Sequence, residues 1–302
     1  MLTLPFRDIS LAISVAVCWA FNLVVIKWAI QSVSPLTLGC LRFIFVAFPL
    51  IFFLPRPKIP LGKLIIIGLL LGVAKFALLF KALELGLSIG MCALTLQTQV
   101  IFTAAFSYFM FGYQLSKREW CGIFLALCGV AMLAAQTDNA ASLAGFALVL
   151  CSAVCWGLSN NISRTLKNVD ILQLTVWMSL IPPLPYFLLS QLWEGPNTFF
   201  ESLHAISLSE ILSLGYIVIA ATLFGLTGWT WLMRQHNPAK VSIYGLLIPV
   251  FSVFFGWLCF DENLSPISVA ACSIVFSGLV INQWPKNAAP RNDLALAMQE
   301  VA

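Results

Sequence analysis

Long apolar runs, each followed by a short polar segment, dominate the chain. A helix that crosses a bilayer needs about 20 consecutive apolar residues. Ten stretches of this kind can be delimited: 9–30, 35–54, 62–82, 88–112, 117–135, 142–163, 171–192, 207–233, 238–260 and 265–284. The polar segment 113–119 divides the fourth run from the fifth, and the polar segment 261–266 divides the ninth from the tenth. The pattern predicts an all-α integral membrane protein with ten transmembrane helices and little chain outside the membrane.

Basic residues lie in alternate connections between these runs. One set of connections and tails holds 12 of the 16 Lys and Arg residues: Arg7, Arg56, Lys58, Lys63, Lys117, Arg118, Arg164, Lys167, Arg234, Lys240, Lys286 and Arg291. The other set holds no Lys or Arg but contains Asp138, Glu194, Glu201, Asp261 and Glu262. Because basic connections stay in the cytoplasm, we expect both termini there, with the first run as a retained signal-anchor. This orientation accounts for the net charge of +4 without a nucleic-acid partner.

The two halves of the chain share a sequence. Residues 16–19 read Ala-Val-Cys-Trp, and the same four residues recur 137 positions later, at 153–156. The segments 111–115 and 260–264 also correspond, at an offset of 149. With five helices in each half, the two halves begin on opposite sides of the membrane. We therefore expect two inverted five-helix repeats, 1–137 and 138–284, around a central cavity, followed by a cytoplasmic tail, 285–302. This plan is typical of secondary transporters.

Composition and the reactive residues narrow the function classes. Hydrophobic residues make up 61% of the chain and charged residues 9%, whereas soluble domains carry roughly 25% charged residues. No His, Cys and carboxylate cluster has the spacing of a metal site, no Cys-x-x-Cys pair occurs, and no Gly-rich phosphate loop is present. We expect no metal, no cofactor and no enzymatic activity. A membrane-embedded lipid-modifying enzyme remains the alternative class.

Four basic residues remain once the twelve of the basic connections and tails are set aside, and they lie within the apolar runs: Lys27, Arg42, Lys75 and Lys81. Each buried charge costs of the order of 3 kcal/mol, so each is a functional candidate. Lys75 lies deepest, and we expect it in a substrate cavity, with a structural role as the alternative. Lys27 and Lys81 lie near the outer ends of their runs and can reach the interface. Arg42 is either a functional residue or an anchor near the outer interface.

No Asp or Glu lies at the middle of a run. An exporter of hydrophobic cations needs a buried carboxylate to hold its substrate. The buried positive charges instead favour a substrate that carries a carboxylate.

Neutral polar and aromatic residues complete the candidate substrate site. They are Trp19, Asn22, Gln97, Gln99, Trp156, Asn160, Trp229 and Tyr244. Asn22 follows Trp19 by one helical turn, and the corresponding pair recurs in the second half. Gln97 and Gln99 are two residues apart and cannot share a helix face, and a continuous polar stripe favours Gln99 for the cavity. Hydrogen bonding between neighbouring helices is the alternative role for these side chains.

Several motifs resemble the EamA family of the drug/metabolite transporter superfamily. They are the Trp-x-x-Asn segment at 19–22, the Arg-Phe pair at 42–43 and the Asp-Glu-x-Leu segment at 261–264. The segments 96–99 (Leu-Gln-Thr-Gln) and 46–49 (Val-Ala-Phe-Pro) are similar to the bacterial members that export O-acetylserine and cysteine. One departure is Tyr113, where the family often has Glu at the end of the fourth helix.

The resemblance spans all ten runs. It implies a secondary transporter of the bacterial inner membrane that exports small amino-acid-type metabolites by alternating access. Export of drugs or of other metabolites is the alternative within the superfamily. In the expected mechanism Lys75 pairs with the substrate carboxylate, and export runs down the substrate gradient. Proton coupling through a deprotonated Lys is the other possibility, and a monomer is sufficient to enclose the path.

Overall fold

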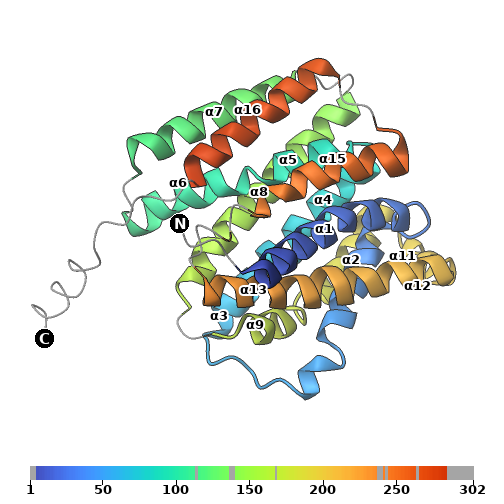
Figure 1. Ribbon diagram of the computed structural model, residues 1–302. Helices are drawn as coiled ribbons and strands as arrows, with labels where there is room; N and C mark the ends of the chain where they lie inside the picture. The colour runs from blue at the N-terminus through green and yellow to red at the C-terminus, as the bar shows by residue number, and fades with distance from the viewer. Residues whose placement is uncertain are drawn as a thin grey trace, which may run out of the picture.

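The computed structural model describes residues 5–112, 115–135, 140–166, 169–236, 241, 244–262 and 265–283. Within these residues every regular element is a helix and no strand occurs (Figure 1). The all-α prediction is therefore confirmed for the described part of the chain. Predictions that concern Tyr113, Asp138, Lys167, Lys240, residues 263 and 264, the repeat boundary at 137 and the tail 285–302 fall outside the described residues.

Among the described residues, seven helical segments are long and apolar enough to cross a bilayer. They are α1 (Phe6–Ala29); α2 (Pro35–Ala47) with η1 (Leu50–Phe52); α3 (Leu61–Ile67) with η2 (Gly68–Ala74) and α4 (Lys75–Glu84); α5 (Ile89–Leu96) with α6 (Gln99–Phe111); α8 (Ala140–Arg164); α9 (Ile171–Met178) with α10 (Pro183–Leu189) and η3 (Ser190–Glu194); and α12 (Leu208–Gly215) with η4 (Tyr216–Phe224) and α13 (Gly225–Gln235). The described residues also form α7 (Lys117–Ala134), α11 (Thr198–His204), α15 (Leu247–Phe260) and α16 (Pro266–Gln283).

Two of the long segments change from α- to π-helix in their middle third. The η2 segment interrupts α3–α4, and the η4 segment interrupts α12–α13. A π-helical turn shifts the hydrogen bonds from i−4 to i−5, leaves a carbonyl group available and rotates the side chains that follow. Both segments contribute to the cavity described below.

Polar side chains define where several helices begin. Ser116 and Glu119 form a reciprocal capping box at the start of α7, and Asp170 accepts the backbone N–H groups of the first turn of α9. These caps satisfy amide groups that have no partner within the helix. Two other helices, α6 and α15, end at Gly112 and Asp261, which adopt positive φ angles of 65° and 51°. The helix ends therefore lie at polar segments of the sequence.

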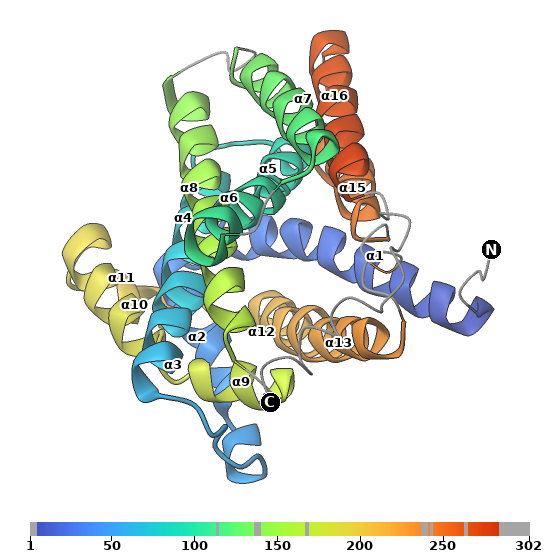
Figure 2. The same cartoon turned by 90° about the vertical axis from the view of Figure 1, so that its left-hand side faces the viewer.

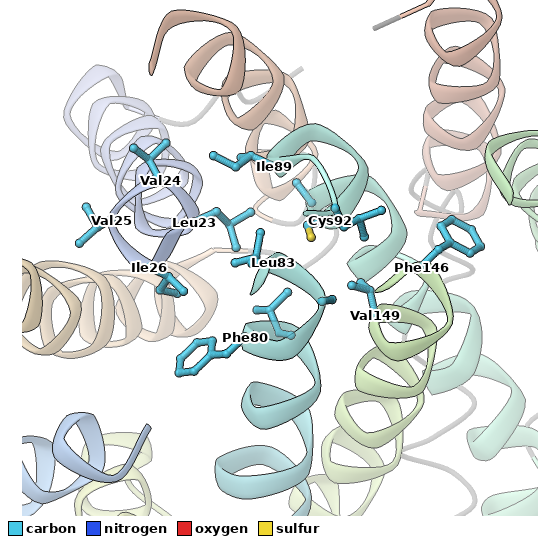
Figure 3. Close-up of a cluster of buried hydrophobic side chains, with 14 of the residues drawn as sticks. Leu23, Val24, Val25, Ile26, Phe80, Leu83, Ile89, Cys92, Phe146 and Val149 are labelled. Carbon is cyan, nitrogen blue, oxygen red and sulfur yellow. The ribbon is translucent and has the colours of Figure 1, made fainter. Parts of the chain in front are cut away.

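The largest apolar core joins α1, α4, α5 and α8 (Figure 3). Ile26, Phe80, Ile89 and Val149, one from each helix, are completely buried. Burying side chains of this size stabilises a fold by about 1.5–3 kcal/mol each in water. In a bilayer, van der Waals packing supplies the larger share. This core holds together the helices that surround the cavity.

The helices pack in a pattern that relates the two halves of the chain. α1 lies between α15 and the η4–α13 segment (Figure 2), and α8 contacts both α5–α6 and the η2–α4 segment. α2 packs against α10, and α5 packs against α15. If α1 is exchanged with α8, and each following segment with its counterpart, the same contacts are obtained.

α7 and α16 form the most extensive helix pair and lie side by side along one edge of the bundle (Figures 1 and 2). Gly129 and Gly278 make this approach possible. A Cβ atom at Gly129 would lie 2.7 Å from the backbone nitrogen of Val275, and one at Gly278 would lie 2.7 Å from the carbonyl oxygen of Gly122. Small residues at such crossings allow two backbones to approach within a membrane.

Candidate functional site

A cavity of about 190 Å³ lies among the helices of both halves. Its walls come from α1, α2, α4, α5, α8, α9, α13 and α15 and from the π-helical segments η2 and η4. The polar lining consists of Asn22, Arg42, Lys75, Gln97, Thr175 and Thr222, and the aromatic lining of Trp19, Phe43, Phe76 and Trp156. No Asp or Glu lines the cavity among the described residues. We take this cavity as the candidate substrate site.

Lys75 is the first residue of α4 and follows the η2 segment directly. The residue is only 8% exposed, and its ammonium group lies 3.9 Å from the ring centroid of Trp156 and 4.1 Å from that of Phe76. Ring faces attract cations and replace part of the lost hydration. The hydroxyl of Tyr186 donates to two carbonyl oxygens of η2, those of residues 72 and 73, at 2.9 and 3.1 Å. This contact holds the π-helical turn that orients Lys75.

Arg42 reaches the same cavity from α2 and is 5% exposed. Its Nη2 atom donates to Oγ1 of Thr222 at 3.1 Å, and its guanidinium carbon lies 3.9 Å from the ring centroid of Phe76. Two further guanidinium nitrogens, Nε and Nη1, are buried without a hydrogen-bond partner. A buried donor without a partner costs about 1–3 kcal/mol, and more when it is charged. Arg42 is therefore available to bind an acceptor that enters the cavity.

The two cations lie close together. Both contact the ring of Phe76, and their distances to its centroid sum to 8.0 Å, which is the upper limit for the separation of the charged centres. At 8 Å and an effective dielectric constant of 20, like charges repel by about 2 kcal/mol. In the described part of the chain neither cation forms an ion pair, whereas Lys27, Lys81 and Arg234 each pair with a carboxylate. The site is therefore electrostatically incomplete without an anion.

The neutral side chains surround this positive centre. Asn22 has a buried Oδ1 atom without a partner. Gln97 lies at the end of α5, and its Nε2 atom donates to the carbonyl oxygen of Gly245 at 3.2 Å. The indole of Trp19 donates to the carbonyl oxygen of Ala221 at 2.8 Å, which joins α1 to the η4 segment. Asn22 can thus accept a hydrogen bond, while Trp19 forms a fixed wall.

Gln99 and Asn160, two of the predicted site residues, lie outside the cavity lining. The Nδ2 atom of Asn160 donates to Oε1 of Gln99 at 2.8 Å, between α6 and α8. The polar stripe that favours Gln99 assumes one uninterrupted helix. The structure instead breaks the segment between α5 and α6, at Gln97 and Thr98. This break directs Gln97 to the cavity and Gln99 to the interface with α8.

Trp229 and Tyr244, the two remaining candidates, also lie outside the lining. Trp229 packs on Trp19 with ring centroids 5.4 Å apart and an interplanar angle of 52°. Tyr244 packs with Trp229 against an apolar cluster formed by Ala12, Leu232 and Val241. Trp229 therefore packs against Trp19 of the lining, and Tyr244 belongs to the apolar cluster next to it.

The structure places two further polar residues in the cavity: Arg42, whose role the sequence leaves open, and Thr222, which the sequence does not single out. An Arg inside an apolar run marks Arg42 as unusual, but the sequence does not decide between a cavity residue and an anchor. Thr222 gives no signal, since an isolated Thr is common in membrane helices. Its position opposite Arg42 depends on the η4 turn, where its hydroxyl donates to the carbonyl oxygen of Ile217 at 2.8 Å.

Comparison with known proteins places the chain in a family. The sequence pattern described as the EamA-like transporter family matches residues 7–135 and again 143–283. A protein of Escherichia coli K12 named "Probable amino-acid metabolite efflux pump" is 36% identical over 290 residues, which cover 93% of this chain and 97% of the relative. A protein of the same name from Salmonella typhimurium is 36% identical over 91% of this chain and 94% of the relative.

More distant comparisons agree. An uncharacterized transporter of Bacillus subtilis is 24% identical over 90% of this chain and 95% of the relative. A solved crystal structure with 17% sequence identity has the same fold, with a TM-score of 0.62 over 91% of this chain and 96% of that chain. The match in both halves and the similarity along nearly the whole chain confirm the resemblance drawn from the sequence motifs. The protein is a multi-pass membrane transporter that belongs to the EamA-like transporter family.

Proposed function

We propose that this transporter exports small amino-acid-type metabolites, such as cysteine or O-acetylserine, across the bacterial inner membrane. The observation that carries the proposal is the pair of buried cations without carboxylate partners, Arg42 and Lys75, in one small cavity. A carboxylate placed between them would accept the free donors and relieve the repulsion of the two charges. The names of the Escherichia coli and Salmonella relatives support the direction of transport and the substrate class.

The proposed architecture has ten transmembrane helices in two inverted five-helix repeats, residues 1–137 and 138–284. The family pattern matches once in each half, and the most extensive helix contacts correspond when the halves are exchanged. The π-helical segments η2 and η4 begin at residues 68 and 216, and the left-handed helix ends of α6 and α15 lie at residues 112 and 261, so equivalent features occur at offsets of 148 and 149. Both termini and the tail 285–302 lie in the cytoplasm in this proposal, as the basic connections predict.

In the proposed mechanism the cavity opens alternately to the two sides of the membrane. Arg42 and Lys75 hold the substrate carboxylate, and Oδ1 of Asn22 accepts a hydrogen bond from the substrate nitrogen. Gln97 contacts the polar side group, while Trp19 and Trp156 form the walls. Two related halves can exchange their conformations, which gives inward-open and outward-open states of similar energy.

A drug exporter is the second candidate within the family, and two observations favour the metabolite. The cavity of about 190 Å³ is smaller than the range of about 300–1,000 Å³ for drug-sized ligands. In addition, the described lining offers no carboxylate to a cationic drug. The same lack of an acidic group favours downhill export over proton exchange, and a monomer is sufficient because the described helices of one chain supply the whole lining given above.

The test is counterflow of labelled cysteine and O-acetylserine in liposomes that contain the purified protein. We expect competition by other amino acids and none by a cationic dye. Lys75→Ala should abolish substrate binding while most of the protein still elutes as a folded species in size-exclusion chromatography. Lys81→Ala is the matched control, because Lys81 lies on the same helix, is 55% exposed and pairs with Glu84 outside the cavity. Competition by the dye alone would contradict the proposal.

A further inference from the structure

The charge of the cavity places a further limit on its substrate. Three other basic residues in the described part of the chain, Lys27, Lys81 and Arg234, each have a carboxylate oxygen within 3.5 Å. Arg42 and Lys75 have none, and the described lining contributes only neutral side chains besides them. The lining therefore carries two positive charges and no negative charge when both groups are protonated.

A zwitterionic amino acid does not neutralise such a site. Its carboxylate is attracted by both cations, but its ammonium group, only two bonds further along the molecule, is repelled by both. The described lining has no acidic group to pair with that ammonium. Two rings of the lining that bind cations, Phe76 and Trp156, already contact Lys75, and Phe76 also contacts Arg42. The site therefore has a partner for the carboxylate and no charged partner for the ammonium group.

A neutral N–H group fits the remaining polar atoms better. The unpartnered Oδ1 atom of Asn22 is a neutral acceptor and can accept one hydrogen bond from an amide N–H group. The amide of Gln97 lies in the same lining and can bond to an amide carbonyl group. A substrate with a carboxylate beside an amide therefore fits this lining. Arg42 and Lys75 would bind the carboxylate, and the side-chain amides of Asn22 and Gln97 would bind the substrate amide.

We infer that the cavity selects amino-acid-sized carboxylates whose net charge is negative, and in particular amino acids whose amino group is acylated, over zwitterionic amino acids. This inference rests on the proposed function, because it concerns the substrate class of the same site. Within the proposed class of small amino-acid-type metabolites, it restricts the preferred substrates to those with a net negative charge.

Serine, O-acetylserine and N-acetylserine allow the effect of substrate charge on binding to be distinguished from the effect of substrate size. The two acetyl derivatives are isomers, but O-acetylserine keeps its ammonium group whereas N-acetylserine is a monoanion. Binding to the purified full-length protein would be measured by isothermal titration near pH 6.5, and counterflow by the same three compounds in proteoliposomes. We expect N-acetylserine to bind at least about tenfold more tightly than O-acetylserine, and serine to bind no better than O-acetylserine.

Two variants connect the preference to the two cations. Arg42→Gln and Lys75→Gln each remove one positive charge, and each should reduce the ratio between the isomers to about threefold or less. Lys81→Gln changes the charge of the chain equally but lies outside the cavity, so it should keep the full ratio. The ratio is measured only on protein that elutes as a folded species, so loss of folding does not imitate the effect.

The outcomes separate this inference from the proposed function. Equal or tighter binding of O-acetylserine would overturn the charge preference while leaving export of amino acids in place. A preference that persists unchanged in both cavity variants would also overturn it, because the selectivity would then arise elsewhere. Absence of binding and counterflow for all three compounds would overturn the inference together with the proposed substrate class.

Discussion

The contact between Lys27 and Glu262 gives a sharp prediction about stability. The ammonium group of Lys27 lies 2.5 Å from Oε1 of Glu262, and the two side chains are only 18% and 13% exposed. The second carboxylate oxygen accepts the backbone N–H of Ile89 at 2.7 Å, at the start of α5. This one carboxylate therefore joins α1, α5 and the end of α15.

Replacing Glu262 by Gln removes the charge and nearly preserves the size. Removing one partner of a buried ion pair costs about 3–5 kcal/mol, because the remaining charge stays buried. The remaining exposure of this pair reduces the expected loss to about 2–3 kcal/mol. The control is Glu84→Gln, which breaks the pair with Lys81. Those side chains are 39% and 55% exposed, and such surface pairs contribute about 0.2–1 kcal/mol.

The assay is the fraction of detergent-solubilised protein that stays monodisperse after heating through a series of temperatures. We expect the midpoint for Glu262→Gln to fall by roughly 5 °C and the midpoint for Glu84→Gln to change by less than about 2 °C. In the double variant Lys27→Met with Glu262→Gln, part of the loss should be recovered, since no unpaired charge remains buried. Equal shifts for the two single variants would refute the reasoning.

Three further predictions follow from packing and hydrogen bonding. Gly129→Ala should lower the same heating midpoint by several degrees because its Cβ atom would meet the backbone of α16, whereas Gly62→Ala, with no atom within 4 Å, should not. Gln97→Leu should reduce counterflow and lower the midpoint only slightly, because one carbonyl oxygen, that of Gly245, loses a long hydrogen bond. Gln99→Leu should lower the midpoint more, because it leaves the side chains of Asn160 and Thr103 without their shared acceptor between α6 and α8. Tyr186→Phe should lower the midpoint and weaken substrate binding, since two carbonyl oxygens of η2 lose a donor at a cost of about 1–3 kcal/mol; unchanged binding would contradict the role given to this hydroxyl.

Much of the helix pattern can be predicted from the sequence, because the cost of burying polar backbone in a bilayer leaves few choices. The apolar run 62–82 corresponds to the segment Leu61–Glu84, and the run 142–163 corresponds to α8. Polar segments end the helices where hydropathy predicts. Lys75 could be singled out for the same reason, since a charge in the middle of an apolar run is costly anywhere except at a site.

The parts that could not be predicted depend on backbone irregularities and on contacts between distant segments. Periodicity assumes a regular α-helix, so it cannot anticipate the break at Gln97 and Thr98 or the π-helical turn before Lys75. These irregularities decide which side chain faces the cavity. Arg42 is the clearest case, because its position beside Thr222 joins residues 180 positions apart in the sequence. A single sequence contains no information about that proximity.

The two unneutralised cations of the cavity also have a consequence for the energetics of export. A substrate that leaves the cytoplasm as a monoanion moves along the membrane potential, which is negative inside the cell. Each elementary charge then contributes about 2.3 kcal/mol per 100 mV, close to a fiftyfold concentration ratio at equilibrium. A zwitterion crosses the same potential without any such contribution. A site that selects anions can thus draw on the membrane voltage directly, and export requires no proton-carrying carboxylate in the cavity.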